Sequence, residues 1–284
     1  MRVMQEIGQM LTISICCSRN TATMEERSKI LIYDDAGCAC TFDLVRILGN
    51  YFGPKGVMVK RTTADDIVKN NALNEQVLAL FIPGGAATPY MNKLRVLGNE
   101  KIRNYVENGG IYFGICAGAY YASRKVSFEQ DVPDLAIEQS CGLDLIDAHA
   151  VGTLKNDFGL DPYYRPTVGN AAVTTIRWLE DGEEHGVFYH GGPKFEQVKG
   201  AEVLAVYAEA EGNPPAIVAR QYGKGMAIVS GVHFEDDAIS LKSMMRCHAK
   251  FLEKAQMNLA KMSSYELDRQ RLTDKLMQKL LKHR

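Results

Sequence analysis

The chain has 284 residues, enough for one large domain or two small ones, and 46% of them are hydrophobic. Its 33 basic and 34 acidic side chains give a net charge of -1, which argues against a nucleic-acid-binding protein with a basic surface. The longest unbroken apolar runs reach six residues, as in Val77–Ile82, whereas a membrane-spanning helix needs about 20. We therefore expect a soluble globular protein with no nucleic-acid partner and no membrane segment.

The seven cysteines are an odd number, so at least one is unpaired in any monomer. They form no C-x-x-C pair and have no His-x-x-x-His partner, which argues against a disulfide scaffold and a structural zinc site. Cys38 and Cys40 lie beside Asp34 and Asp35, but two cysteines so placed in a loop are more often unrelated than a metal or redox pair. We expect no metal, no cofactor, and a reducing compartment, of which the cytoplasm is the simplest.

Residues 1–28 carry no sustained hydrophobic period, so we expect an N-terminal tail. Met10–Cys17 is mildly apolar, but Thr12 and Ser14 interrupt it, and a signal peptide usually has a longer apolar core. A weak export signal, lipid attachment at Cys16 and a true start at Met24 stay open as alternatives.

From residue 29 the sequence alternates between short apolar runs and amphipathic segments. The run VLALFI is apolar throughout, as in a strand that is covered on both faces. Strand, helix, strand, helix in this rhythm predicts a parallel sheet with helices on both sides. We expect strands at Lys29–Tyr33, Val57–Lys60, Val77–Ile82 and Ile111–Ile115, and helices at 41–52, from Ala64, at 99–108 and from Ala117.

The second half of the chain is rich in β-branched and aromatic residues separated by Gly, Pro and acidic turns. Strands are expected at Ala172–Trp178, Gly186–His190 and Glu202–Ala208. Two further strands, Ala216–Tyr222 and Met226–Ser230, flank Gly223-Lys224-Gly225 and predict a hairpin.

From Ala238 the pattern becomes helical. A single apolar stripe is formed by Leu241, Met245, His248, Leu252, Ala255, Leu259 and Met262. A capping box at Ser263-Ser264-Tyr265-Glu266 would start another helix, whose stripe is Leu272, Leu276 and Leu280. Six basic residues against three acidic ones give residues 263–284 a net charge of +3. We expect a domain at 29–262 and a basic amphipathic helix at 263–284, which packs on the domain or on a second copy in a homo-oligomer. A membrane-surface or partner-specific role of this helix is the alternative.

Gly114-Ile115-Cys116-Ala117-Gly118 has the form G-x-C-x-G at the junction of a buried strand and a helix. This is the nucleophile-elbow arrangement with cysteine in the serine position. The glycines leave room for a sharp turn, and the helix N-terminus favours the thiolate. The N–H of Ala117 then faces an oxyanion formed by attack of Cys116. The alternative is a structural cysteine that packs as a small hydrophobe.

His233 has the best context of the six histidines for a base, because it follows an expected strand and the tight Gly231. Glu235 lies two residues on, and in an extended segment both side chains point the same way, so the carboxylate can orient the imidazole. The alternative for Glu235-Asp236-Asp237 is a solvated acidic turn.

Ile82-Pro83-Gly84-Gly85-Ala86 ends the third expected strand and offers backbone N–H groups for an oxyanion hole. Each of the three pieces is weak alone, because Pro-Gly-Gly is more often an ordinary turn. Together they fall at strand ends of one parallel sheet, where open α/β folds bind ligands.

These motifs, in this order, resemble the class I glutamine amidotransferase superfamily. The likeness is closer to one branch, the N-terminal domain of biotin-protein ligases and its stand-alone relatives. It covers roughly residues 29 to 252 and is carried by IPGGAATPYM (82–91), GICAGAYYAS (114–123), FYHGGPKF (188–195) and YGKGMAIVSGVHFE (222–235).

The resemblance implies a flavodoxin-like three-layer α/β sandwich with a mainly parallel sheet, followed here by the β-rich second half and the C-terminal helices. It implies a triad of Cys116, His233 and Glu235, with oxyanion donors at Gly85 and Ala117. Further candidate substrate contacts are Gly84, Ala86, Tyr120, His190 and Gly191. For His190, an ordinary loop histidine is an equal alternative. Tyr163, Tyr164 and Arg165 are expected to be exposed, with a substrate-lid role as the alternative.

The departures from the family pattern are informative. Glutamine-using members typically carry Gln four residues after the cysteine, where this chain has Tyr120. The usual His-Pro-Glu is His233-Phe234-Glu235. No biotin-ligase catalytic domain follows residue 252, so we expect that the chain is not a biotin ligase by itself.

Two functions therefore stay open. The first is a cysteine hydrolase or amidase that acts on a small-molecule amide or ester. The second is a non-catalytic ligand-binding or regulatory module.

Overall fold

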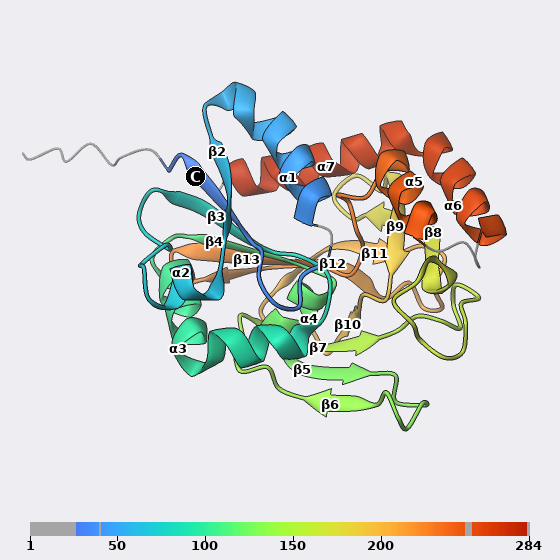
Figure 1. Ribbon diagram of the computed structural model, residues 1–284, viewed down its shortest axis with the longest axis horizontal. Coiled ribbons are helices and arrows are strands. Elements are labelled where there is room, and N and C mark those ends of the chain that lie inside the picture. The colour runs from blue at the N-terminus through green and yellow to red at the C-terminus, as the bar shows by residue number, and fades with distance from the viewer. Residues whose placement is uncertain (1–26, 40, 248–251, 283–284) are drawn as a thin grey trace, which may run out of the picture.

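A sheet of nine strands runs through the molecule, in the order β2-β1-β3-β4-β13-β12-β11-β8-β9 (Figure 1). The structure is a computed structural model that describes residues 27–39, 41–247 and 252–282. Five strands are parallel: β1 (Lys29–Tyr33), β2 (Met58–Thr62), β3 (Val77–Ile82), β4 (Ile111–Ile115) and β13 (Gly225–Ser230). Four strands extend the sheet in antiparallel fashion: β12 (Pro215–Tyr222), β11 (Glu202–Tyr207), β8 (Ala171–Trp178) and β9 (Glu184–His190).

Helices cover both faces of this sheet (Figure 1). On one face, α1 (Thr41–Phe52) and α7 (Glu266–Leu281) pack into one apolar core, and the three leucines of the α7 stripe are fully buried there. On the other face lie α2 (Ala64–Val68), α3 (Ala87–Glu107) and α4 (Ala117–Ala122). The three-layer α/β sandwich predicted from the sequence is thus confirmed. Single turns of 3-10 helix occur at Gly53–Lys55 and Val168–Asn170.

A second sheet of four strands lies beside α4, in the order β10-β7-β5-β6 (Figure 1). None of its strands was predicted, and two of them have only three residues each. It is built from β5 (Ser123–Phe128), β6 (Ile137–Gln139), β7 (Ile146–Gly152) and β10 (Lys194–Glu196). The helix expected from Ala117 ends after six residues, and the chain enters β5 directly.

Three other expectations need correction. The helix expected at 99–108 begins at Ala87, and its interior is broken at Arg95, where φ is 54°. The stripe expected on one helix divides between α5 (Ala238–Cys247) and α6 (Leu252–Ser264), and residues 248–251 lie outside the described residues. The capping box is wrong, because the hydroxyls of Ser263 and Ser264 donate to carbonyls of α6 and the N-cap residue Tyr265 makes no side-chain cap.

The expected tail lies almost entirely outside the described residues, so its alternatives stay predictions. Among the helices that the structure describes, none has the length and apolar content that a bilayer crossing requires.

Candidate active site

Cys116 occupies the sharp turn between β4 and α4. Its backbone has φ 49° and ψ −102°, a region that a residue with a Cβ rarely adopts. The N–H of Cys116 donates to the carbonyl of Ser230 at 2.8 Å, so the turn is tied to the end of β13. Such strain persists only where the surrounding structure imposes it, and it is concentrated at functional sites.

The two glycines of G-x-C-x-G are required by space. A Cβ on Gly118 would collide with the carbonyl oxygen of Ile82 in β3, and a Cβ on Gly114 would collide with the carbonyl oxygen of Gly118. The elbow can therefore form only if both positions lack a side chain.

The predicted oxyanion donors are the backbone N–H groups of Gly85 and Ala117, and both residues line one cavity together with Cys116. Ala86 N donates to Gly37 O at 2.9 Å and Gly118 N donates to Pro83 O at 3.2 Å, whereas the intervening donors on Gly85 and Ala117 make no backbone hydrogen bond within the described part of the chain. Gly85 has φ 139°, and a Cβ there would collide with the carbonyl oxygen of Gly37. Neither predicted donor is used by the backbone of the described residues, as a role in binding an oxyanion would require.

His233 follows β13, which is parallel to the neighbouring strand β4, so His233 and Cys116 come after the carboxyl ends of adjacent strands. The backbone N–H of His233 donates to Phe188 O at 2.8 Å. In the side chain, Nδ1 of the ring lies 2.8 Å from Oε1 of Glu235. Gly84 lies beside both side chains, since a Cβ at Gly84 would lie 2.7 Å from Cε1 of His233 and 3.5 Å from the Cβ of Cys116. The structure therefore brings the three predicted triad residues together around Gly84.

The charges in this cluster are coupled. Burial would lower the pKa of His233, but the Glu235 carboxylate and the Cys116 thiol raise it well above its ordinary value. The charges around His233 therefore favour the imidazolium form. The thiol of Cys116 also donates to the carbonyl of His190, with sulfur and oxygen 3.5 Å apart.

The acidic turn after His233 is buried, which rules out the solvated alternative. Glu235, Asp236 and Asp237 are 5%, 4% and 5% exposed. Burial and the neighbouring Glu235 carboxylate raise the pKa of Asp236 to about 8, so Asp236 is largely protonated at neutral pH. Nδ1 of His233 lies 3.7 Å from Oδ2 of Asp236 and 2.8 Å from Oε1 of Glu235.

Helices from both ends of the chain hold this turn. Arg46 of α1 lies 2.9 Å from a carboxylate oxygen of Asp237 and 2.9 Å from one of Asp43. Arg269 of α7 is buried, donates to Phe234 O at 3.1 Å, and forms two hydrogen bonds with Glu266. The carbonyl that separates His233 from Glu235 is therefore fixed by α7.

Two cavities meet at Cys116. The first, of about 170 Å³, is called the histidine cavity here, and its lining includes Gly84, His190, His233, Glu235 and Asp236. The second, of about 190 Å³, is called the aromatic cavity, and its lining includes Ala86, Ala117, Tyr120, Phe128 and Gly191. Cys116, Gly85 and Tyr164 line both. All ten predicted site residues thus fall on one or both cavities.

Asp236 was not among the predicted site residues, and Tyr164 was predicted to be exposed, with a substrate-lid role as the alternative. Tyr163 and Arg165 are exposed as expected, but Tyr164 is partly buried between the two cavities, and nothing in its sequence context distinguishes it from its neighbours. Asp236 looked like part of a surface turn, because the residues that bury it come from distant parts of the chain.

The site could also hold a metal ion, although none was expected. His233, Glu235 and Asp236 offer ligand atoms within 4.8 Å of one another. An ion bound there through Nδ1 would displace the contact between His233 and Glu235. The sequence also raised Cys38 and Cys40 as a metal or redox pair. The thiol of Cys38 donates to Tyr33 O at 3.2 Å, and Cys40 lies outside the described residues.

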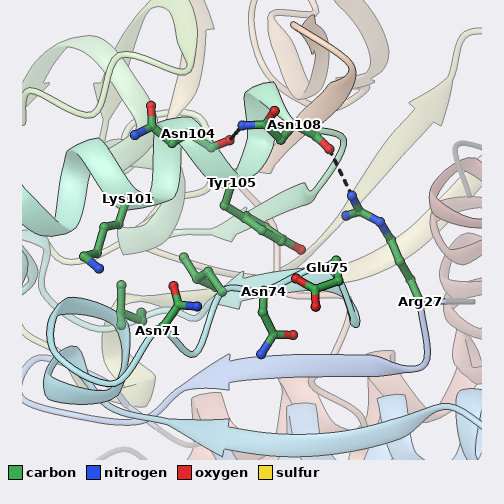
Figure 2. A pocket seen from close by; sticks show the side chains of 10 residues that line it. Arg27, Asn71, Asn74, Glu75, Lys101, Asn104, Tyr105 and Asn108 are labelled. Carbon is green, nitrogen blue, oxygen red and sulfur yellow. Dashed lines mark hydrogen bonds between the residues drawn. The ribbon is translucent and has the colours of Figure 1, made fainter. Parts of the chain in front are cut away.

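A larger cavity of about 460 Å³ lies at the amino-terminal ends of the parallel strands, opposite to the end where Cys116 lies (Figure 2). Arg27 closes one side of it by donating to Asn108 O at 3.0 Å, and amide side chains, Lys101 and Glu75 line the rest. Open parallel sheets bind ligands at the carboxyl ends of their strands, and Cys116 lies at that end. We therefore place the candidate site at Cys116.

Comparison with known proteins places the chain in a family. Residues 28–283 match the family described as "Biotin-protein ligase, N terminal". An uncharacterized protein of Chlamydia muridarum is 28% identical over 263 residues, which are 90% of this chain and 97% of that protein. A biotin–protein ligase of Schizosaccharomyces pombe is 27% identical over 164 residues, which are 56% of this chain and 26% of the ligase. The aligned segment thus amounts to about a quarter of the ligase.

Among solved structures, a glutamine amidotransferase from Thermotoga maritima superimposes with a TM-score of 0.51 and 14% identity, over 91% of this chain and 96% of that one. At this identity the likeness concerns the fold alone. The resemblance that the motifs indicated is confirmed, and the chain belongs to the biotin-protein ligase N-terminal domain family, with the fold of the glutamine amidotransferase-like proteins.

Proposed function

We propose that the protein is a cysteine-dependent hydrolase that cleaves an amide or ester through Cys116, His233 and Glu235. One observation carries the proposal. Cys116 is held in strained backbone at a strand-to-helix turn and lines the same cavity as a buried His–Glu pair.

In the first half of the reaction, the Cys116 thiolate attacks the carbonyl carbon. An S–C bond forms, and the carbonyl π electrons move to oxygen, where the N–H groups of Gly85 and Ala117 stabilise the oxyanion. The intermediate then collapses, the C–N or C–O bond breaks, and the leaving group takes a proton from the His233 imidazolium. The product is a thioester on Cys116.

In the second half, neutral His233 takes a proton from water as the water oxygen attacks the thioester. The S–C bond breaks, the carboxylic acid leaves, and the thiolate–imidazolium pair is restored. Glu235 orients the ring through Nδ1 and stabilises its charge in both halves.

Glutamine is a poor candidate substrate. Tyr120 replaces the family glutamine, and its hydroxyl already donates to Gly191 O at 3.1 Å. The proposal also requires a free thiol at Cys116, which a reducing compartment such as the cytoplasm preserves.

A screen of small amides and esters tests the proposal, with the wild-type protein and the Cys116→Ser variant compared side by side. We expect hydrolysis of at least one compound by the wild type and a loss of about 100-fold or more in Cys116→Ser, because the hydroxyl is a much weaker nucleophile at neutral pH. Cys38→Ser serves as the matched control and should retain full activity. Equal rates in all three proteins would contradict the proposal and favour a binding module.

A further inference from the structure

The aromatic cavity differs in character from the rest of the candidate site. Its lining residues come from α4, from the first turn of α3, and from β5 and β6 of the small sheet. Figure 1 shows where these elements lie in the fold. Tyr120, Phe128 and Tyr164 form a row of edge-to-face rings, with centroids 5.8 Å and 5.2 Å apart. Such packing fixes the rings and gives the cavity rigid apolar walls.

The described residues that line this cavity include no charged side chain. Two of its polar side chains already have partners, because the Tyr120 hydroxyl donates to Gly191 O at 3.1 Å and Gln139 Nε2 donates to the sulfur of Met91 at 3.5 Å. A ligand with an ammonium or a carboxylate would lose its hydration there without gaining an ionic partner. The cavity therefore favours an uncharged, apolar group.

The size of the cavity limits that group. Its volume is about 190 Å³. An engineered apolar cavity of about 150 Å³ in another protein binds benzene, so one six-membered ring or a chain of about five carbons fits here. Cys116, Gly85 and Ala117 line the same cavity, which places the sulfur and both oxyanion donors at its wall.

We propose that the aromatic cavity holds the acyl group of the substrate, and that this group is uncharged, apolar and about the size of a pentyl chain or a phenyl ring. This inference rests on the proposed function. The leaving group would then lie in the histidine cavity, where His233 can protonate it.

Chloromethyl ketones test the inference, because their carbonyl can occupy the oxyanion hole while the Cys116 sulfur displaces chloride, forming a C–S bond and breaking the C–Cl bond. The rate of labelling is measured by mass spectrometry of the Cys116 peptide and divided by the rate for a free peptide thiol. We expect the pentyl and phenyl ketones to label about 10- to 100-fold faster than the methyl ketone, since each buried methylene favours binding by about 0.8 kcal/mol. The glutamine-derived ketone should show no such advantage.

A variant that fills the cavity supplies the control. Ile137 lies on β6, is partly buried and lines the aromatic cavity, so Ile137→Trp should cancel the rate advantage of the pentyl and phenyl ketones over the methyl ketone. Leu179→Trp is the matched control, because Leu179 is 49% exposed and lines neither cavity. It should leave every rate at the wild-type value.

The outcomes separate the two proposals. Equal normalised rates for all ketones would overturn the cavity inference, while rapid labelling of Cys116 would still support the nucleophile. Selective labelling without hydrolysis of hexanoyl or benzoyl amides and esters would support the inference and count against the hydrolase.

A measurement that needs no reaction completes the test. Hexanamide should raise the melting temperature of Cys116→Ser more than acetamide does at the same concentration. Absence of that difference would also overturn the inference.

Discussion

The turn that carries Cys116 and the turn that carries His233 lie at the ends of neighbouring strands, yet different interactions shape them. The Cys116 turn has a local sequence signature, with strained backbone at one residue and a glycine two positions away on either side, and the backbone contacts named above join it to the neighbouring strands β3 and β13. The His233 turn has no such local signature. It is held by Arg46 from α1 and Arg269 from α7, which are far from it in sequence.

The difference has consequences for stability and for function. A turn whose glycines pack directly on backbone atoms tolerates no added atom at those positions. A turn held by buried ionic groups depends on elements across the fold, and its own charges respond to pH. Four variants, ordered from the largest expected effect to the smallest, separate these two kinds of dependence.

Gly118→Ala should have the largest effect. The added methyl group would collide with the carbonyl oxygen of Ile82, and backbone atoms cannot yield as a flexible side chain does. We expect a loss of about 3–5 kcal/mol in the free energy of unfolding, or no folded protein at all. Gly49→Ala in α1 is the control, because its Cβ would meet no atom within 4 Å. It should stabilise the protein by about 0.5–1 kcal/mol in urea unfolding, and a similar loss in both variants would contradict the account.

Glu235→Gln should affect the reaction rather than the fold. The amide is of similar size but cannot stabilise the imidazolium of His233, so we expect kcat to fall by about 10²- to 10⁴-fold with little change in KM. The substrate is the best ester or amide from the screen. Glu184→Gln, on an exposed residue of β9, should retain full activity. A change of less than twofold in Glu235→Gln would remove Glu235 from the triad.

Arg269→Met should destabilise the His233 turn from a distance. It leaves the carbonyl of Phe234 and the carboxylate of Glu266 without their cationic partner, and we expect a loss of about 2–4 kcal/mol in the free energy of unfolding. Arg271→Met on the same helix is the matched control. The side chain of Arg271 is 64% exposed, so we expect a change below about 0.5 kcal/mol. An equal change in the free energy of unfolding in both variants would show that the contact of Arg269 with the His233 turn does not stabilise the fold.

Asp236→Asn should change the pH dependence of stability. In the folded protein the pKa of Asp236 is raised to about 8, whereas the unfolded chain releases the proton near pH 4, at about the reference pKa of 3.9. The folded state binds more protons between these values, so Asp236 lowers stability as the pH rises through this window. The Asp236→Asn variant lacks this loss. The difference between its free energy of unfolding and that of the wild type should therefore grow by about 2–4 kcal/mol in its favour between pH 5 and pH 9.

Urea unfolding at several pH values measures that difference. Asp134→Asn, on an exposed residue, should give a curve parallel to wild type. A parallel curve for Asp236→Asn as well would show that Asp236 is ionised at neutral pH, contrary to the account.

The same contrast explains what the sequence could predict. The parallel strands were predicted because runs such as VLALFI are apolar on both faces, and the Cys116 elbow was predicted because its glycines and its strand are contiguous. The small sheet was missed because β6 has three residues and β5 carries Arg124 and Lys125 on its exposed positions. Asp236 was missed because its burial depends on residues that only the fold brings close.

The pH dependence of Cys116 alkylation by iodoacetamide tests the central claim most directly. The claim is that the Cys116 sulfur is paired with an imidazolium on His233, because the pKa of His233 is raised well above its ordinary value. Cys116 in the wild type should therefore react at pH 6.5 at least ten times faster than a free peptide thiol, because about 99% of a free thiol is protonated at that pH. His233→Ala should abolish that advantage. If Cys116 instead reacts at the peptide rate, with the same pH profile in both proteins, the account of this site as a thiolate–imidazolium centre is wrong.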